Sequence, residues 1–106
     1  MSSVYRGTGA ANIPLFTRYE DSIYDGNNIS GYPAFTVHGD YLYEGNFYVS
    51  PIVTVIGGSV YRGMGMSSIP AGTIQGNYIY EGNGMNSQPI GYCPDGDEML
   101  LAACVA

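Results

Sequence analysis

The chain has 106 residues, of which 45% are apolar and only 11% are charged, and its formal net charge at pH 7 is −6. This length suits one folded domain, and the high apolar and low charged content disfavour an intrinsically disordered chain. The cations are three arginines with no lysine, so counterion release does not favour binding to nucleic acid. We expect neither nucleic acid nor an anionic membrane as a partner.

The sequence contains no apolar run of the roughly 18 residues that span a bilayer. No basic and then apolar leader precedes the first repeat, so we expect a cytoplasmic protein. Cys93 and Cys104 are the two cysteines. In a reducing compartment we expect two free thiols, with a bridge between them as the alternative.

A four-residue pattern recurs along the chain: an aliphatic residue, tyrosine, a charged residue and glycine. Its glycines are spaced by 19, 19, 18 and 19 residues, and a proline follows each glycine after 6 or 7 residues. The step from each proline to the next glycine is always 12 residues, so the variable part is the loop between glycine and proline. The pattern predicts one domain over 1–106 built from repeats. The repeats cover 3–20, 21–39, 40–58, 59–76 and 77–94.

Each 12-residue segment is typical of a β-hairpin. After the proline come β-branched, aromatic and small apolar residues, with threonine three residues after the proline in four of five repeats. A two-residue turn follows, as in Gly39-Asp40, Gly57-Gly58 and Gly76-Asn77, whereas Glu20-Asp21 is the poorest turn sequence. The return strand carries the tyrosine and ends at the glycine. We predict hairpins over 14–27, 33–46, 51–64 and 70–83.

The two ends of the repeat region complement each other. Residues 3–8 resemble a return strand without an outgoing strand, and residues 89–93 resemble an outgoing strand without a return strand. Pairing of these ends closes the array and removes exposed strand edges. The sequence therefore predicts an all-β, pseudo-symmetric closed array of flower or barrel type, with four-fold or five-fold closure left open. An open solenoid or an oligomer that covers the edges is the alternative.

The last residues depart from the repeat. Asp97 suits an N-cap, Glu98 suits a first helical turn, and the Met, Leu and Ala residues that follow favour a helix. We predict a short apolar helix over 97–106 that is buried, either inside the open end of the sheet array or against another subunit. A final strand is the alternative.

These repeats resemble a known family. Tandem aliphatic-Tyr-x-Gly-Asn and Pro-x-x-Thr repeats over residues 3–93 are similar to those of small, largely uncharacterised bacterial proteins with a hairpin-repeat β-flower arrangement. The Gly-Asn pair stands at Gly26, Gly45 and Gly82, but becomes Gly7-Thr8 and Gly63-Met64 elsewhere. The resemblance implies a fold and no chemical activity.

The repeated tyrosines hold one place in each repeat. Strand side chains alternate between faces, so each tyrosine lies on the face opposite to its aliphatic and charged neighbours. We expect them to pack across strands, and the alternative is an aromatic platform for a sugar or a protein. The set comprises Tyr5, Tyr24, Tyr43, Tyr61 and Tyr80.

The charged position of the repeat is read as a solvated surface belt. It is occupied by Arg6, Asp25, Glu44, Arg62 and Glu81, and pairs such as Asp25 with Arg6 and Glu44 with Arg62 are expected. His38, the single histidine, precedes a turn and lacks a matching nucleophile. No residue set has the spacing of a metal or cofactor site, and we expect no enzymatic activity.

The loops between glycine and proline differ among repeats, which is how binding surfaces are usually mounted on a scaffold. The candidate interaction surface comprises Phe47, Tyr48, Met64, Met66 and Met85. We therefore expect a non-enzymatic repeat module that binds a protein partner or itself as a homo-oligomer. A module that binds a carbohydrate or small ligand through the tyrosines is the alternative.

Overall fold

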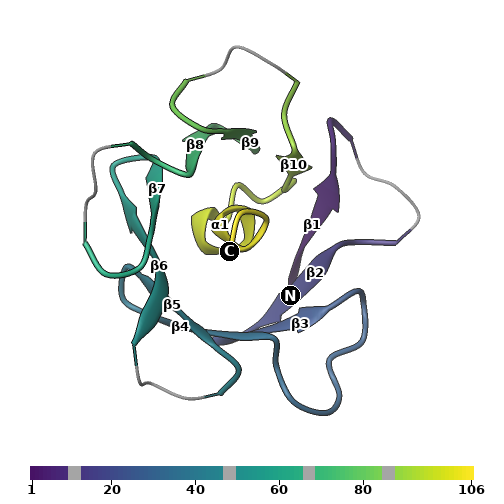
Figure 1. Cartoon of the computed structure of the whole chain (residues 1–106). Helices are drawn as coiled ribbons and strands as arrows, with labels where there is room; N and C mark the ends of the chain where they lie inside the picture. Colours follow the sequence, from purple (N-terminus) through teal and green to yellow (C-terminus); the bar gives the residue numbers. More distant parts are fainter. Residues whose placement is uncertain (10–12, 47–49, 66–68, 85–87) are drawn as a thin grey trace.

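The structure, a computed structural model, describes residues 1–9, 13–46, 50–65, 69–84 and 88–106. These residues form a short-stranded sheet that curls into a closed ring, with a helix inside it and loops that extend outward like petals (Figure 1). The elements are β1 (Ser2–Arg6), β2 (Phe16–Tyr19), β3 (Ser22–Asp25), β4 (Phe35–His38), β5 (Tyr41–Glu44), β6 (Pro51–Ile56), β7 (Ser59–Arg62), β8 (Gly72–Gln75), β9 (Tyr78–Glu81), β10 (Gly91–Tyr92) and α1 (Glu98–Ala103).

The sheet closes through its two chain ends, as the sequence predicts. β1 pairs antiparallel with β2 on one side and with β10 on the other, where Tyr5 lies opposite Tyr92 and Arg6 lies opposite Gly91. The strands follow chain order around the barrel, so the described residues make five hairpin units, one of them assembled from β10 and β1. Closure is thus five-fold within the described residues, and the open solenoid is wrong.

Two-residue turns join the strands of the four hairpins that are continuous in sequence, at the expected places. Gly39, Gly57 and Gly76 begin three of them, with φ between 57° and 63°, a region in which a side chain is strained. Glu20 begins the remaining turn at φ 56° and is the one non-glycine residue with positive φ among the described residues. The turn predicted to be poorest is therefore the one that places a side chain in the left-handed region.

The interior of the barrel is built from the aliphatic residue of each repeat. These residues are fully buried, whereas the tyrosine after each is half-buried on the outer wall. The buried set comprises Val4, Ile23, Leu42, Val60 and Ile79, each at 0% exposure. The alternation inferred from the sequence is therefore confirmed, because strands of four residues keep a strict two-residue period.

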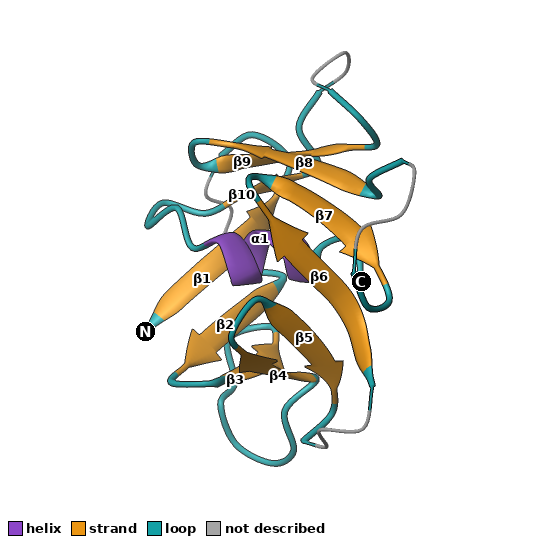
Figure 2. Ribbon diagram, turned by 90° about the vertical axis from the view of Figure 1, so that its left-hand side faces the viewer, coloured by secondary structure: helices purple, strands orange, loops and turns teal. Residues whose placement is uncertain are grey.

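The helix α1 lies along the centre of the ring and closes its interior (Figures 1 and 2). It packs against β1, β2, β6, β8 and β9, and Leu100 and Leu101 are fully buried. Asp97 caps it through bonds from the backbone N–H groups of Met99 and Leu100, as predicted. The helix ends at Ala103 instead of 106. No helix among the described residues is long and apolar enough to cross a membrane.

The repeated threonine forms a hydrogen bond to the start of the loop that follows its hairpin. Thr17, Thr36, Thr54 and Thr73 each donate from Oγ1 to the carbonyl of the glycine nine residues later. In two repeats the same hydroxyl also accepts from a loop N–H, for example from Gly65 to Thr54 at 3.0 Å. The Pro-x-x-Thr spacing therefore has a structural cause that periodicity alone did not reveal.

Replacing Thr54 by Val is expected to lower the free energy of unfolding by about 1–2 kcal/mol. The change keeps the shape of the side chain, which is 2% exposed, but leaves the Gly63 carbonyl and the Gly65 N–H without their partner. Urea denaturation measures the change. Thr54→Ser keeps the hydroxyl and should retain most of the stability. A Val variant as stable as the wild type would show that water replaces both bonds.

Candidate functional site

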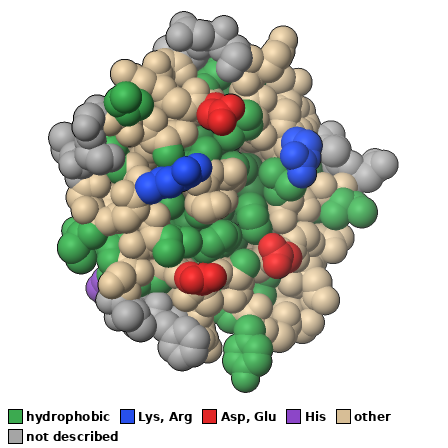
Figure 3. Space-filling view, in the orientation of Figure 1, with side chains coloured by type: hydrophobic (Ala, Val, Ile, Leu, Met, Phe, Trp, Pro, Cys, Tyr) green, Lys and Arg blue, Asp and Glu red, His purple; other side chains and the backbone are tan. Residues whose placement is uncertain are grey.

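The barrel has two unlike ends. The two-residue turns lie at one end, together with the start of α1. At the other end, called the mouth here, each return strand finishes in its charged residue, and the petal loops begin. The mouth faces the viewer in Figures 1 and 3, and the helix points its last residues toward it.

A ring of charges surrounds the mouth. The ring consists of Arg6, Asp25, Glu44, Arg62 and Glu81, all exposed. Their strand partners are Gly91, Phe16, Phe35, Val53 and Gly72 in the same order. Directly opposite residues of antiparallel strands share a face, so the ring lies on the inner face with these partners. Figure 3 shows the charged side chains around an apolar centre.

The predicted ion pairs within this ring do not occur in the described structure. The ion pairs of the described residues join Arg18 to Asp21 and to Asp97, at the other end of the barrel. Among the described residues, Arg62 donates to the carbonyl of Val105 at 3.3 Å. No side-chain hydrogen bond is formed there by the other four members of the ring, Arg6, Asp25, Glu44 and Glu81. The ring is therefore a set of charges available to another molecule.

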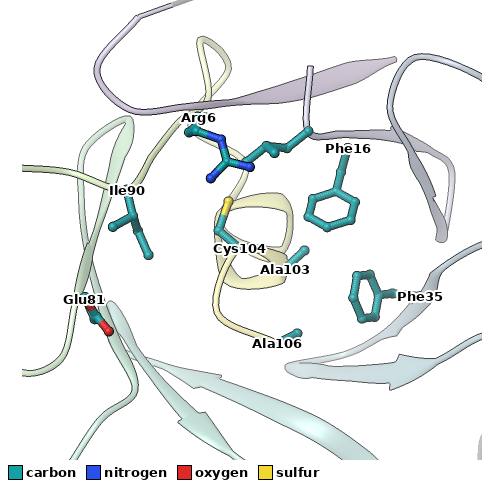
Figure 4. A pocket seen from close by; sticks show the side chains of 9 residues that line it. Arg6, Phe16, Phe35, Glu81, Ile90, Ala103, Cys104 and Ala106 are labelled. Carbon is teal, nitrogen blue, oxygen red and sulfur yellow. The ribbon is translucent and has the colours of Figure 1, made fainter. Parts of the chain in front are cut away.

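Apolar side chains form the floor of the mouth. A cavity of about 400 Å³ is lined by Leu15, Phe16, Phe35, Ile90 and the end of α1, with Arg6 and Glu81 at its rim (Figure 4). The rings of Phe16 and Phe35 meet edge to face, with centroids 5.5 Å apart. An apolar floor inside a charged rim suits recognition of an apolar group that carries charge at its border.

The residue opposite the charged one differs among the repeats. Its size determines how closely the end of α1 approaches each strand. A Cβ added at Gly91 would lie 2.8 Å from Sγ of Cys104, and one at Gly72 would lie 3.3 Å from Cγ1 of Val105. Glycine thus lets the end of α1 approach β8 and β10 closely. Phe16 and Phe35 occupy the same repeat position in β2 and β4, where they form the floor of the cavity.

Both cysteines are free thiols, as expected. Burial raises the pKa of Cys93 and raises the pKa of Cys104 to about 12, where the neighbouring Cys93 adds to the rise and Arg6 opposes it. A thiol is nucleophilic as its thiolate. Both side chains therefore stay protonated at neutral pH, and Cys104 forms part of the apolar wall of the cavity.

The repeated tyrosines do not meet in one platform around the mouth. Tyr24, Tyr43, Tyr61 and Tyr80 lie opposite the repeated threonines on the outer wall, each half-buried. Ring contacts among the described residues join Tyr41 to Tyr43 and Tyr78 to Tyr92, with centroids 6.4 and 5.2 Å apart. The tyrosines are thus distributed around a convex wall.

Other candidate residues have separate places. His38 is exposed at the end of β4, and no group of three metal-ligating side chains occurs among the described residues. Met64 of the predicted interaction surface is 72% exposed, whereas Phe47, Tyr48, Met66 and Met85 lie outside the described residues. The sequence predicts strands at Phe16 and Phe35 but gives no sign that these two side chains form the floor of the mouth.

Exposed apolar side chains also stand on the petals. Ile13, Tyr32 and Ile69 each precede a repeat proline and are 68%, 88% and 69% exposed. The petals join strand ends at the mouth, so these side chains extend the mouth outward, and Figure 3 shows hydrophobic side chains at the periphery. We define the mouth face as the charged ring, the apolar floor and these petal side chains.

Comparison with known proteins agrees with a β-flower fold. A family model described as "6-fold beta flower protein" matches residues 4–103. Neither a curated protein nor a solved structure matches the chain significantly. The described residues form five hairpin units rather than the six of that description. With nearly its whole length matched, the chain belongs to the 6-fold beta flower protein family.

Proposed function

We propose that this small structural repeat protein is a non-enzymatic interaction module that binds protein surfaces through its mouth face. The observation that carries the proposal is the apolar floor of Phe16 and Phe35 inside a ring of exposed charges that form no ion pair with one another in the described structure. Protein interfaces commonly combine an apolar, aromatic centre with a polar rim. The mouth face has this arrangement before any partner is present.

The closed sheet supports the mouth as the contact surface. The strands of the barrel are paired on both sides, so a partner strand finds no free edge to extend among the described residues. The outer wall offers half-buried tyrosines on a convex surface. The mouth is concave, and an apolar side chain of a partner fits its cavity of about 400 Å³.

A displayed peptide library selected against sparsely immobilised protein tests the proposal. We expect enrichment of peptides with an apolar anchor flanked by charges, because this pattern matches the floor and the ring. Binding should weaken about tenfold or more with Phe35→Ser, which removes part of the floor. Tyr19→Ser changes a 47% exposed residue of the outer wall and should leave binding unchanged.

Phe35→Ser tests the floor and carries a folding risk, so Arg6→Glu provides a second reading at an exposed position. At the flanking position that faces residue 6 it should change the preferred charge from acidic to basic, while the circular dichroism spectrum stays unchanged. The proposal is wrong if no peptide is enriched, or if enriched peptides bind both mouth variants as tightly as the wild type.

Recognition of a carbohydrate or small ligand through the tyrosines remains the second prediction. Of the repeated tyrosines, Tyr43 forms a ring pair with Tyr41, with centroids 6.4 Å apart. A sugar platform requires an exposed ring face, and these rings are half-buried. The mouth face therefore has the stronger physical support.

A further inference from the structure

We propose that the partner of the mouth face is a second copy of this chain, bound mouth to mouth about a two-fold axis. This inference rests on the proposed function of the mouth face and names the protein that it binds. It is carried by the order of charges in the ring, by the place of the two phenylalanines, and by the size of the face.

The order of charges makes the ring self-complementary. Strand order places the residues in the circular sequence Arg6, Glu81, Arg62, Glu44 and Asp25. A two-fold axis in the plane of contact puts one position of the ring opposite itself and pairs the remaining four. With Asp25 on the axis, Arg6 lies opposite Glu44 of the other copy, and Arg62 lies opposite Glu81 of the other copy. Every arginine then meets an acid.

Two positions of the two-fold axis, at Asp25 and at Glu44, pair every arginine with an acid; each is called a register here. The phenylalanines of the floor favour the register with Asp25 on the axis. Phe16 and Phe35 lie in β2 and β4, on either side of β3, which carries Asp25. An axis at Asp25 therefore brings Phe16 of one copy over Phe35 of the other, and both copies share one aromatic centre. The register with Glu44 on the axis pairs Arg6 with Glu81 and Arg62 with Asp25, but does not bring the phenylalanines together. Asp25 is also the shortest side chain of the ring, which limits like-charge repulsion at the axis.

The face is large enough for a specific dimer. The molecule is a disc with extents of 36, 33 and 15 Å. An ellipse with the two longer extents as its axes has an area of about 900 Å², and standard-size interfaces bury roughly 800 Å² per partner. The petal side chains Ile13, Tyr32 and Ile69 widen the contact beyond the ring.

Sedimentation velocity over a range of protein concentrations tests the dimer. The wild type should dimerise, and Arg6→Glu should raise the dissociation constant about tenfold or more, because it places two acids opposite each other twice per dimer. Glu44→Arg should do the same. In an equimolar mixture of the Arg6→Glu and Glu44→Arg proteins, a mixed dimer has opposite charges at both of these contacts, so the mixture should form more dimer than either variant alone.

Asp25→Asn distinguishes the two registers without a charge reversal. With Asp25 on the axis it removes a like-charge contact and should tighten the dimer, whereas in the other register it removes a partner of Arg62 and weakens the dimer. All three positions are exposed, so the variants should keep the wild-type fold, which circular dichroism checks. A wild type that stays monomeric, or single variants that dimerise like the wild type, would overturn the inference. Peptide selection on the same monomer then still decides whether the mouth binds other proteins.

Discussion

Replacing Leu101 by Ala is expected to lower the free energy of unfolding by about 2–5 kcal/mol. The side chain is fully buried in the centre of the barrel, where α1 packs against strands from opposite sides of the ring. Alanine favours the helix itself, so the loss reports the cavity left in the core and not a weaker helix. A domain of this size is stabilised by only about 5–15 kcal/mol in total.

Urea denaturation followed by circular dichroism measures this loss, and Glu98→Ala provides the matched control. Glu98 lies in the same helix but is exposed, so its replacement should change stability by only a few tenths of a kcal/mol. If Leu101→Ala were as mild as the control, the helix would be a surface appendage and the barrel would be stable without it. The floor of the mouth would then lose its support, because Ala103 and Cys104 line it.

Much of the fold follows from the spacing of proline and glycine. The invariant 12-residue step predicts the hairpins, since proline suits a strand start and Gly39, Gly57 and Gly76 permit the turns. The unmatched half-hairpins at 3–8 and 89–93 predict closure, and β1 pairs with β10. Local chemistry also predicts the helix cap at Asp97. These features depend on residues close in sequence or repeated with a fixed period.

The arrangement of residues at the mouth is harder to predict from the sequence than the hairpins are. Alternation shows that Arg6 and its equivalents share a face with the buried aliphatic residues, but it does not reveal that strands of four residues end there. The charges therefore lie at an open end, above the core, and were read as a surface belt. The floor combines Phe16 and Phe35 with glycines at equivalent positions, and only the placement of α1 explains why one repeat position holds both kinds of residue.

The link between Arg18 and Asp97 is the second structural feature with a large expected effect. Arg18 donates through Nη1 to both carboxylate oxygens of Asp97 at 3.1 Å, although the residues are 79 positions apart. The Arg18 Nε donates to the carbonyl of Glu20 at 2.7 Å, which also supports the strained turn. The side chains are 24% and 18% exposed, so solvent screens the pair only partly. This contact fastens the start of the helix to β2.

Arg18→Met is expected to lower the free energy of unfolding by about 2–3 kcal/mol, because it removes charge-assisted bonds and leaves a partly buried carboxylate without its cation. Asp97→Asn separates the ion pair from the cap, since asparagine caps a helix about as well as aspartate. It should cost less than Asp97→Ala, which also removes the bonds from the N–H groups of Met99 and Leu100.

The double variant Arg18→Met/Asp97→Asn completes a double-mutant cycle by urea denaturation. Its loss of stability should be smaller than the sum of the single losses by about 1–2 kcal/mol, because either single change already removes the charge pair. Additive losses would show that each residue acts alone, through the turn or through the cap. Coupling between them would instead show that a contact between the first hairpin and the final helix closes the end of the barrel opposite the mouth, and so keeps the floor in place.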